Sequence, residues 1–160
     1  MNKIAILILS ILTFSCNSKA QEIKKEAQKY AVVKTETQWK AQLSDIEYSV
    51  LRQAGTERAF SSPLNKNKVE GIYVCKACGV PLYKSEYKFD SGTGWPSFDR
   101  AIEKNIEYDV DYKIGYARSE LKCSNCGSHL GHVFDDGPKN TTVMRHCING
   151  VALKFIPKKQ

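Results

Sequence analysis

Two Cys-x-x-Cys turns constrain the fold of this chain more than any other feature of its sequence. They are Cys75-Lys76-Ala77-Cys78-Gly79 and Cys123-Ser124-Asn125-Cys126-Gly127, and they lie well apart along the chain. Two such turns can hold one metal ion through four thiolates, in the tetrahedral arrangement of structural zinc. The glycine after each second cysteine suits the tight turn that points both sulfurs of a pair in one direction. We therefore predict a zinc site formed by Cys75, Cys78, Cys123 and Cys126.

Two other interpretations of the paired cysteines stay open. Disulfides form in oxidising compartments, so each pair could be a redox dithiol, or the two turns could be cross-linked. We favour zinc because two similar turns are needed for one metal site and would be redundant for a redox site. Four protein ligands leave the ion no open coordination position, so we expect it to hold two hairpins together and to take no part in chemistry.

The first 15 residues have the features of a targeting segment and are left out of the fold prediction. Lys3 gives a positive start, residues 4–14 are apolar, and Ser15 precedes Cys16. The apolar run is shorter than the roughly 20 residues that a membrane-spanning helix needs. The segment resembles a bacterial lipoprotein signal, in which the cysteine is lipidated and becomes the new N-terminus. The resemblance implies an exported protein that a lipid on Cys16 anchors to a bacterial membrane.

One position departs from the lipoprotein pattern, which leaves ordinary secretion as the alternative. Such signals usually have leucine three positions before the cysteine, where this chain has Thr13, with Leu12 one step further back. Residues 17–34 are polar and rich in lysine, which favours a flexible tether. We therefore expect a signal peptide over 1–15, a tether over 16–34, one domain over 35–157 and a short tail over 158–160.

The charge of the chain is moderate and scattered. The 24 basic and 17 acidic residues give a formal net charge of +7, and no basic block is interleaved with aromatic residues. This pattern indicates a solvated surface, and we expect no nucleic-acid partner. A hydrophobic content of 42% in 160 residues is enough for the core of one domain.

Two capping boxes predict two short helices at the start of the domain. Thr35 with Gln38 and Ser44 with Glu47 have the spacing at which the first side chain accepts a hydrogen bond from a backbone amide that a helix start leaves unpaired. The second helix is expected to end at Gly55, a residue type that suits a helix end. The apolar residues expected to face the core are Trp39, Leu43, Ile46, Val50 and Leu51.

After a loop over 58–70, the periodicity becomes that of strands. Short, often alternating segments are separated by Gly, Pro, Asp or Asn, with no helical segment between them. They predict a mainly β domain with antiparallel sheets, as a sandwich or open barrel. The predicted strands cover 71–74, 80–83, 106–112, 114–121, 132–134, 143–145 and 148–156.

Cys147 is the one cysteine that belongs neither to a Cys-x-x-Cys turn nor to the leader. Arg145 and His146 flank it, and neighbouring cations lower the pKa of a thiol towards the reactive thiolate. The alternative is a buried structural cysteine, because free cysteine often packs as a small hydrophobe. Histidines elsewhere in the chain favour the nucleophile, since partners of a catalytic cysteine are brought in by the fold.

Two further motifs are candidates for the site. Ser91-Gly92-Thr93-Gly94-Trp95-Pro96-Ser97-Phe98 is a glycine-rich turn that cannot easily hold a regular element, and its tryptophan is either a core residue or a platform that faces a ligand. His129 and His132 follow the second cysteine turn. They could be structural or metal-binding, but with a nucleophile nearby they suit acid–base chemistry near neutral pH.

The order and spacing of these motifs resemble the B type of peptide-methionine (R)-S-oxide reductases. The motifs are the two cysteine turns, Ser-Gly-x-Gly-Trp-Pro-Ser-Phe, His-Leu-Gly-His-Val-Phe-x-Asp-Gly-Pro and Arg-x-Cys-Ile-Asn, and the resemblance runs from about residue 37 to 155. It implies a pair of antiparallel sheets with short N-terminal helices. It also implies a structural zinc ion and reduction of methionine sulfoxide in oxidised proteins.

The resemblance implies a role for each site residue. Cys147 is the nucleophile, Trp95 lies against the S-methyl group of the substrate, and Arg145 favours the thiolate. The hydrogen-bonding wall for the sulfoxide oxygen consists of His129, His132 and Asn149. Phe134 and Asp136 match positions that shape and support this wall.

The implied reaction leaves Cys147 as a sulfenic acid, which an external dithiol such as thioredoxin must reduce. Many members of the family have a second, resolving cysteine at the position held here by Thr93. A hydroxyl cannot form a disulfide, so we expect a shallow site that a reductant protein reaches directly. The alternatives are a zinc-stabilised binding module in which Cys147 is only buried, and a thiol redox sensor without selectivity for sulfoxide stereochemistry.

Overall fold

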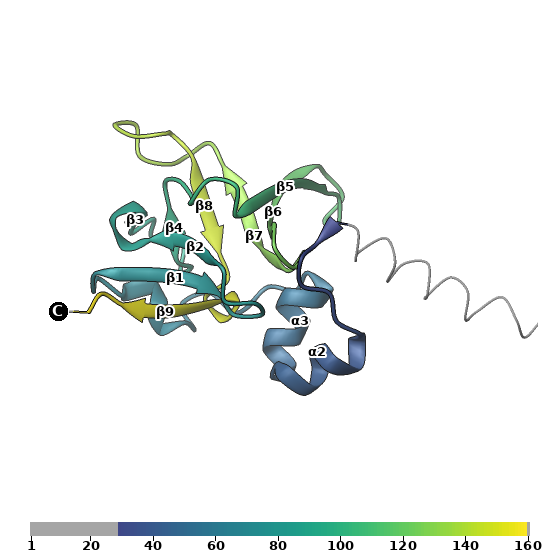
Figure 1. The fold of residues 1–160 in the computed structure, drawn as a ribbon. Coiled ribbons are helices and arrows are strands. Elements are labelled where there is room, and N and C mark those ends of the chain that lie inside the picture. Colours follow the sequence, from purple (N-terminus) through teal and green to yellow (C-terminus); the bar gives the residue numbers. More distant parts are fainter. Residues whose placement is uncertain (1–28, 160) are drawn as a thin grey trace, which may run out of the picture.

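The computed structural model describes residues 29–159. The predicted signal segment over 1–15 and Cys16 lie outside the described residues. Within them, two antiparallel sheets stand side by side, and two α-helices pack near one end of the larger sheet (Figure 1). Neither helix has the length and apolar surface that crossing a bilayer requires in the part of the chain that the structure describes.

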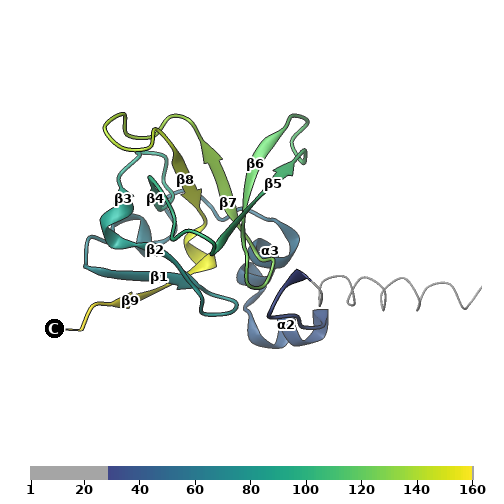
Figure 2. The same ribbon diagram turned by 45° about the horizontal axis from the view of Figure 1, so that its top comes forward.

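The sheets confirm the predicted mainly β fold. In the three-stranded sheet the order is β2 (Pro81–Lys84), β1 (Gly71–Cys75) and β9 (Leu153–Pro157). In the six-stranded sheet the order is β3 (Lys88–Phe89), β4 (Ser97–Phe98), β8 (Arg145–Ile148), β7 (His129–Phe134), β6 (Arg118–Cys123) and β5 (Ile106–Asp111). All paired neighbours are antiparallel, and the two views of the ribbon show β8 and β7 at the centre of the fold (Figure 2).

A cluster of aromatic rings joins the two sheets. The ring of Phe98 on β4 stacks on Tyr83 of β2 with centroids 4.3 Å apart, and it meets Tyr73 of β1 edge-on at 5.0 Å. All three side chains are fully buried. Such rings bury large apolar areas, and their edge-on and offset contacts add about 0.5–1.5 kcal/mol per pair. The cluster therefore fixes β4, and the glycine-rich turn before it, relative to the smaller sheet.

Both predicted helices form where their capping boxes place them. Thr35 caps α2 (Glu36–Gln42) and Ser44 caps α3 (Asp45–Gln53), and in both boxes the two reciprocal hydrogen bonds are present. The second helix ends at Gln53, two residues before the predicted Gly55. Ala54 takes the left-handed conformation with φ 51°, and the Gly55 amide donates to the Ser49 carbonyl at 2.9 Å.

Four of the five apolar residues predicted to face the core are buried, namely Trp39, Leu43, Val50 and Leu51. Ile46 was placed wrongly, since it is 49% exposed, and Tyr48 is the buried residue of that turn. The reason is that α3 buries a face centred on its second half, against β7 and the 3-10 turn η3 (Gly150–Ala152).

Several predicted strand limits are wrong, each for a local reason. The segment 114–121 begins too early, because the chain turns at Gly115, whose φ is 90°. The segment 148–156 is interrupted by η3, and β7 begins at His129 rather than at 132. The glycine-rich turn does hold a short strand, β4, which pairs with both β3 and β8. Two further 3-10 turns are η1 (Pro63–Lys66) and η2 (Ser85–Tyr87).

The last part of the predicted tether packs on the domain. The Val32 amide donates to the Asn125 carbonyl at 2.9 Å, and the Tyr30 hydroxyl donates to Glu107 at 3.1 Å. The Tyr30 ring lies against Gly127, where an added Cβ would come within 2.5 Å of it. Residues 29–34 therefore cover the second cysteine turn.

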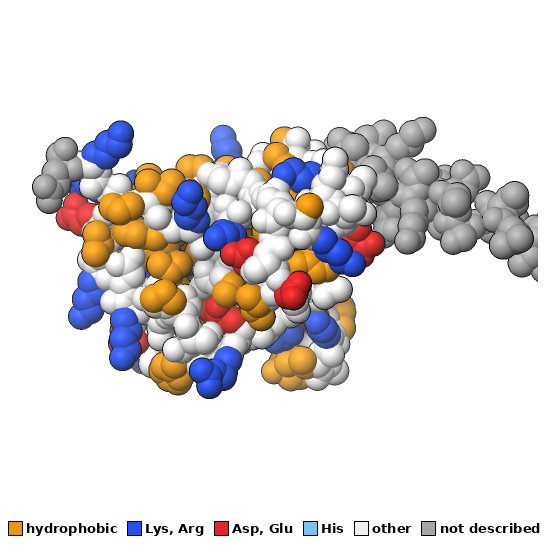
Figure 3. Space-filling model, turned by 90° about the horizontal axis from the view of Figure 1, so that it is seen from below, with side chains coloured by type: hydrophobic (Ala, Val, Ile, Leu, Met, Phe, Trp, Pro, Cys, Tyr) orange, Lys and Arg blue, Asp and Glu red, His pale blue; other side chains and the backbone are white. Residues whose placement is uncertain are grey.

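The charged side chains of the domain are dispersed over the face seen from below. Lysine, arginine and carboxylate side chains alternate there with apolar ones (Figure 3). Such a face offers no single-sign field that would concentrate a polyanion.

Candidate active site

The four paired cysteines converge at one point between the sheets. Their sulfur atoms all lie within 4.8 Å of one another, with 3.8 Å between Cys75 and Cys126 and 3.6 Å between Cys78 and Cys123. Four thiolates bound to zinc at about 2.3 Å lie about 3.8 Å from one another, so the sulfur positions fit a tetrahedral ion. All four are free thiols in the structure.

Side chains from both helices brace the two cysteine turns. The Gln42 amide donates to the Ala77 carbonyl at 2.7 Å, and Arg52 donates to the Cys126 carbonyl at 3.1 Å. Glu47 pairs with Lys76 at 3.0 Å. The helices therefore act on the backbone of the turns and leave the sulfur atoms free to bind a metal.

Cys147 lies on the central strand β8, between β4 and β7. Its register partners are Ser97 on β4 and His132 on β7. A Cβ added at Gly131 of β7 would come within 2.0 Å of the Cys147 carbonyl oxygen. Only glycine allows β7 to approach β8 so closely, which brings His132 beside Cys147.

A small open hollow with a volume of about 130 Å³ lies over Cys147. Five of its lining residues are those predicted from the sequence, namely Trp95, His132, Phe134, Cys147 and Asn149. Three more come from the structure, namely Thr56, Arg118 and Gly131. The hollow therefore unites residues from the connection after α3, the glycine-rich turn and the region of β6, β7 and β8.

Buried Glu57 fixes two of these lining residues. Its backbone amide donates to the Asn149 side chain at 3.0 Å, and its carbonyl accepts from the Trp95 indole at 3.2 Å. Its carboxylate accepts from the amides of Gly150 and Val151 at 2.5 and 3.0 Å. Glu57 thus sets the orientation of one aromatic and one amide side chain that line the hollow.

Burial dominates the electrostatics of Cys147. It raises the pKa of the thiol, while the Arg145 cation and hydrogen bonds from Thr93 and Arg145 lower it by less. Arg145 therefore lowers the pKa of the thiol, as expected, but by less than burial raises it.

Arg145 is held by the two residues expected to support the site. Its Nε and Nη2 atoms donate to the Asp136 carboxylate at 2.7 and 2.9 Å, and its guanidinium lies 4.4 Å from the ring centre of Phe134. The paired carboxylate raises the pKa of Arg145, so the cation is permanent. Asp136 does not line the hollow itself.

His132 is oriented by an acidic residue that the sequence did not identify. Its Nε2 atom lies 2.9 Å from the Asp111 carboxylate, which also pairs with Arg118. A hydrogen bond from the Lys113 amide, with those of His132 and Arg118, holds the pKa of Asp111 well below its usual range. Burial lowers the pKa of His132, and Asp111 opposes this. The carboxylate therefore stays ionised and fixes the imidazole.

His129 does not reach the hollow. It is buried behind His132 with ring centres 5.2 Å apart, and its Nδ1 lies 2.6 Å from Glu120. Its Nε2 has no hydrogen-bond partner among the described residues. The register of β6 and β7 shifts between Leu121 and Lys122, and this bulge is what brings two histidines three residues apart onto one face of a strand. His129 therefore lies beside His132 and is not among the residues that line the hollow.

His146 points to the opposite face of β8 from Cys147. Its ring nitrogens lie 3.3 Å from the Tyr83 hydroxyl and 3.5 Å from the Tyr108 hydroxyl. Burial lowers the pKa of His146 to about 4. It is neutral at physiological pH and supplies no positive charge to the neighbouring thiol.

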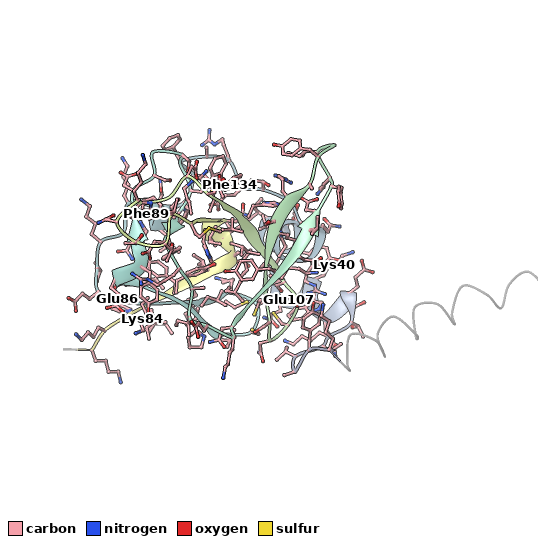
Figure 4. The ribbon with its side chains drawn as sticks, turned by 90° about the horizontal axis from the view of Figure 1, so that it is seen from above. Lys40, Lys84, Glu86, Phe89, Glu107 and Phe134 are labelled. Carbon is pink, nitrogen blue, oxygen red and sulfur yellow. The ribbon has the colours of Figure 1, made fainter. Side chains whose placement is uncertain are left out.

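A second and larger hollow of about 750 Å³ lies beside β1 and β2, with Ile72, Pro81, Lys84 and Glu86 among its lining residues. Figure 4 shows Lys84 and Glu86 at the lower left of the view, away from Phe134 near its top, and the two hollows share no lining residue. This hollow has no cysteine or histidine in its lining. Size alone therefore does not identify the reactive site.

Sequence reasoning missed Asp111, Arg118, Glu57 and Thr56. The first two lie opposite each other across the β5–β6 pair. Their opposite charges on two predicted strands were a signal that the wrong limit of 114–121 obscured. Glu57 and Thr56 sit in a connection without a motif, and only the tertiary structure brings them to the site.

Comparison with known proteins gives a consistent result. The family model described as the SelR domain matches residues 43–157. The peptide methionine sulfoxide reductase MsrB of Chromohalobacter salexigens is 49% identical over 79% of this chain and 96% of its own length. Proteins of the same name from Thiobacillus denitrificans and Methanosarcina barkeri are 50% and 52% identical, over 78% and 81% of this chain and 95% and 90% of their own lengths. Among solved structures, the Mis18 'Yippee-like' domain is 17% identical with a TM-score of 0.46, over 57% of this chain and 99% of that chain.

Proposed function

The chain belongs to the SelR-domain family, together with peptide methionine sulfoxide reductases of the MsrB type, and from this premise we propose that it reduces the R epimer of methionine sulfoxide in proteins with Cys147 as the nucleophile. The observation that carries this proposal is the hollow in which Cys147 faces Trp95, His132 and Asn149. An apolar ring and two polar side chains around a thiol match a substrate with a methyl group and a polar S–O bond.

Bond formation begins at the sulfur atom of the substrate. The S–O bond is polarised with positive sulfur and negative oxygen, so the Cys147 thiolate attacks sulfur. This attack forms a bond between the Cys147 sulfur and the substrate sulfur, and the oxygen gains a proton and leaves as hydroxide when the S–O bond breaks. The hydroxide then attacks the Cys147 sulfur, the bond between the two sulfurs breaks, and methionine leaves as the thioether. Methionine sulfoxide is reduced by two electrons and Cys147 is oxidised to sulfenic acid.

The proton that the oxygen needs is assigned to His132. With Nε2 facing the Asp111 carboxylate, Nδ1 is the nitrogen left for the substrate. The ionised carboxylate stabilises the imidazolium that must form before the proton is donated. His132 acts as the general acid in this scheme, and Asn149, held by Glu57 and by the Leu130 carbonyl at 3.0 Å, acts as a fixed polar contact for the substrate.

The raised pKa of Cys147 favours this scheme over a redox sensor. A sensor cysteine reacts with small oxidants because its thiolate is populated at rest. Burial raises the pKa of Cys147. In this scheme activation depends on a substrate that fills the hollow and brings the sulfoxide within reach, which is a requirement of a selective enzyme.

Recovery of the thiol requires an external dithiol. Thr93, at the position of a resolving cysteine, has no sulfur to offer. A donor thiolate of the thioredoxin kind attacks the sulfenic sulfur and releases water, and its second thiol then displaces Cys147 as the donor becomes a disulfide. The hollow over Cys147 is small and open, which leaves this route free.

Zinc has a structural role in this proposal. Cys75, Cys78, Cys123 and Cys126 would hold the ion and fill its coordination sphere, so it supplies folding stability when bound. The residues around Cys147 carry the reaction independently of this site.

We also propose that the protein is exported and held at a bacterial membrane by a lipid on Cys16. Lys3, the apolar residues 4–14 and the Ser15-Cys16 pair support this proposal. A Cys16→Ser variant should move to the soluble fraction. Equal membrane retention of the variant would contradict the lipid anchor.

The enzymatic proposal is tested on the two separate epimers of a methionine-sulfoxide peptide with a chemical dithiol as reductant. We expect turnover of the R epimer by the domain, and loss of it in Cys147→Ser. Preference for the S epimer, or undiminished turnover in Cys147→Ser, would contradict the proposal.

A further inference from the structure

A chain of three hydroxyl groups leads from the backbone of the glycine-rich turn to Cys147. The Ser97 hydroxyl lies 3.2 Å from the Trp95 carbonyl and 2.7 Å from the Ser91 hydroxyl. The Ser91 hydroxyl lies 2.9 Å from that of Thr93, and a contact from the Thr93 side chain lowers the pKa of Cys147. These contacts are continuous, so each hydroxyl has a neighbour on both sides.

Each hydroxyl has one proton to donate, and this fixes the direction of the whole chain for a given state of Cys147. When Cys147 is a thiol it can donate to Thr93, which then donates to Ser91. Ser91 in turn donates to Ser97, and Ser97 donates to the Trp95 carbonyl. Every donor is used, and the carbonyl at the end can only accept.

A thiolate reverses this order because it can only accept. Thr93 then donates to the Cys147 sulfur, Ser91 donates to Thr93, and Ser97 turns from the Trp95 carbonyl to Ser91. The thiol proton leaves to water, and each hydroxyl keeps its own proton and rotates. The Thr93 amide, 3.4 Å from the Ser91 oxygen, can donate in both states.

From this geometry we infer that Ser97, Ser91 and Thr93 form a reversible hydrogen-bond chain that stabilises the Cys147 thiolate. When Cys147 is a thiolate, the Trp95 carbonyl loses its hydrogen bond from Ser97. The inference rests on the proposed function, in which Cys147 is the nucleophile. It assigns the hydroxyl of Thr93 a role of its own, as the donor that faces the attacking sulfur.

Burial makes such a chain effective. Ser97 is fully buried and pairs directly with Cys147 across β4 and β8. Hydrogen bonds are stronger in a dry environment and reinforce one another along a chain. Water has little access to Ser97, so the neighbouring hydroxyls are the groups available to complete its hydrogen bonds.

The charged groups around Cys147 come from elements other than the glycine-rich turn. Arg145 lies on the same strand, Asp136 follows β7, and His132 is the register partner on β7. Arg118 of β6, paired with Asp111, lines the hollow. The glycine-rich turn contributes neutral hydroxyl donors only, so their removal changes no charge.

The test is the rate at which Cys147 is alkylated as a function of pH, in the zinc-loaded full chain without sulfoxide, with the labelled residue identified by mass spectrometry. Thr93→Val removes the hydroxyl and keeps the shape. We expect it to raise the pH midpoint of alkylation by about one unit, which is the size of one hydrogen bond to a charged group. Thr93→Ser should restore the midpoint.

Ser91→Ala breaks the chain but leaves the Thr93 hydroxyl in place, so it should raise the midpoint by a smaller amount. Thr141→Val is the matched control, because the Thr141 hydroxyl donates only to the Pro138 carbonyl at the surface. An unchanged midpoint in Thr93→Val or Ser91→Ala, or an equal shift in the control, would overturn the inference. Alkylation needs no sulfoxide, so these outcomes are independent of whether Cys147→Ser abolishes reductase activity.

Discussion

The four-cysteine cluster and Cys147 differ in how their surroundings are assembled. Each cysteine turn is closed by residues a few positions apart, and two such turns need only be brought together for all sulfurs to lie within 4.8 Å. Cys147 instead depends on the register of β4, β8 and β7 and on Glu57, which is 90 positions away in the chain. The cysteine cluster is therefore recognisable from short sequence motifs, whereas the Cys147 site depends on contacts made by the whole fold.

The same difference governs the chemistry of the sulfurs. The four sulfurs of the cluster lie close enough to hold one metal ion, which suits a site that adds stability. Cys147 stands apart from other sulfurs, beside a permanent cation and hydroxyl groups, and burial raises its pKa. The role of a cysteine therefore depends on how many other sulfurs lie beside it and on the free-energy cost of burying its thiolate.

The largest effect is expected from Cys78→Ser, which removes one ligand of the cluster. Structural zinc sites can contribute roughly 10 kcal/mol or more of metal-binding free energy to folding. The variant should bind little zinc and lose its cooperative thermal transition. Metal analysis and circular dichroism measure this, and Cys147→Ser is the matched control. A well-folded wild-type protein without zinc would show that the two regions do not differ in this way.

Cys147→Ser should have the converse effect, with loss of turnover and little change in zinc content or thermal stability. The serine hydroxyl does not ionise at neutral pH and cannot become a sulfenic acid, so turnover should fall by a factor of roughly 10³ or more. Cys147 is not in the cluster of sulfurs, so zinc content and the thermal midpoint should stay close to those of the wild type. Loss of zinc in this variant would show that the two sites are coupled.

Asp111→Asn tests the orientation of the acid at the Cys147 site. It keeps the size of the side chain and removes the charge that faces His132 and Arg118. Acid–base groups contribute about 10²–10⁴-fold to rate, so we expect kcat to fall by roughly 10² with a smaller change in KM. Asp109→Asn is the control, because Asp109 lies on the same strand and pairs with Lys122 at the surface. Equal losses in both variants would remove the assigned role of Asp111.

Arg145→Met is expected to have the smallest effect of these variants. Burial already raises the pKa of Cys147, and the cation is what opposes it. Its removal should raise the pKa further, so the rate of thiol alkylation should reach its midpoint at a higher pH than in the wild type. The shift should be within about one unit, since the site is partly open to water. A downward shift would contradict the electrostatic account of the site.

Much of the fold was predictable because its signals are local. The capping boxes at Thr35 and Ser44 place both helices, and the family indicated by the motifs is confirmed by the SelR match. The strand limits failed at Gly115 and at η3, where a turn or a 3-10 segment interrupts an apolar pattern. Periodicity describes faces of regular elements and does not show where a chain bends.

The site was predictable in part for the same reason. Trp95, His132, Phe134 and Asn149 lie in motifs and do line the hollow with Cys147. His129 shares a motif with His132, but it lies against Glu120 and does not line the hollow. No short pattern contains Glu57 or the pairing of Asp111 with His132. These contacts arise from tertiary packing, and the spacing of residues in the sequence does not predict them.

The most direct test of the account is the state of Cys147 after one turnover without reductant. The protein is treated with one equivalent of the R epimer of a methionine-sulfoxide peptide, trapped with a sulfenic-acid reagent and mapped by mass spectrometry. Since Thr93 cannot resolve the intermediate, the account predicts trapped sulfenic acid on Cys147, in proportion to the methionine formed, and unmodified cysteines in the cluster. A disulfide between Cys147 and Cys75, Cys78, Cys123 or Cys126, or methionine formed with no oxidation of Cys147, would contradict it.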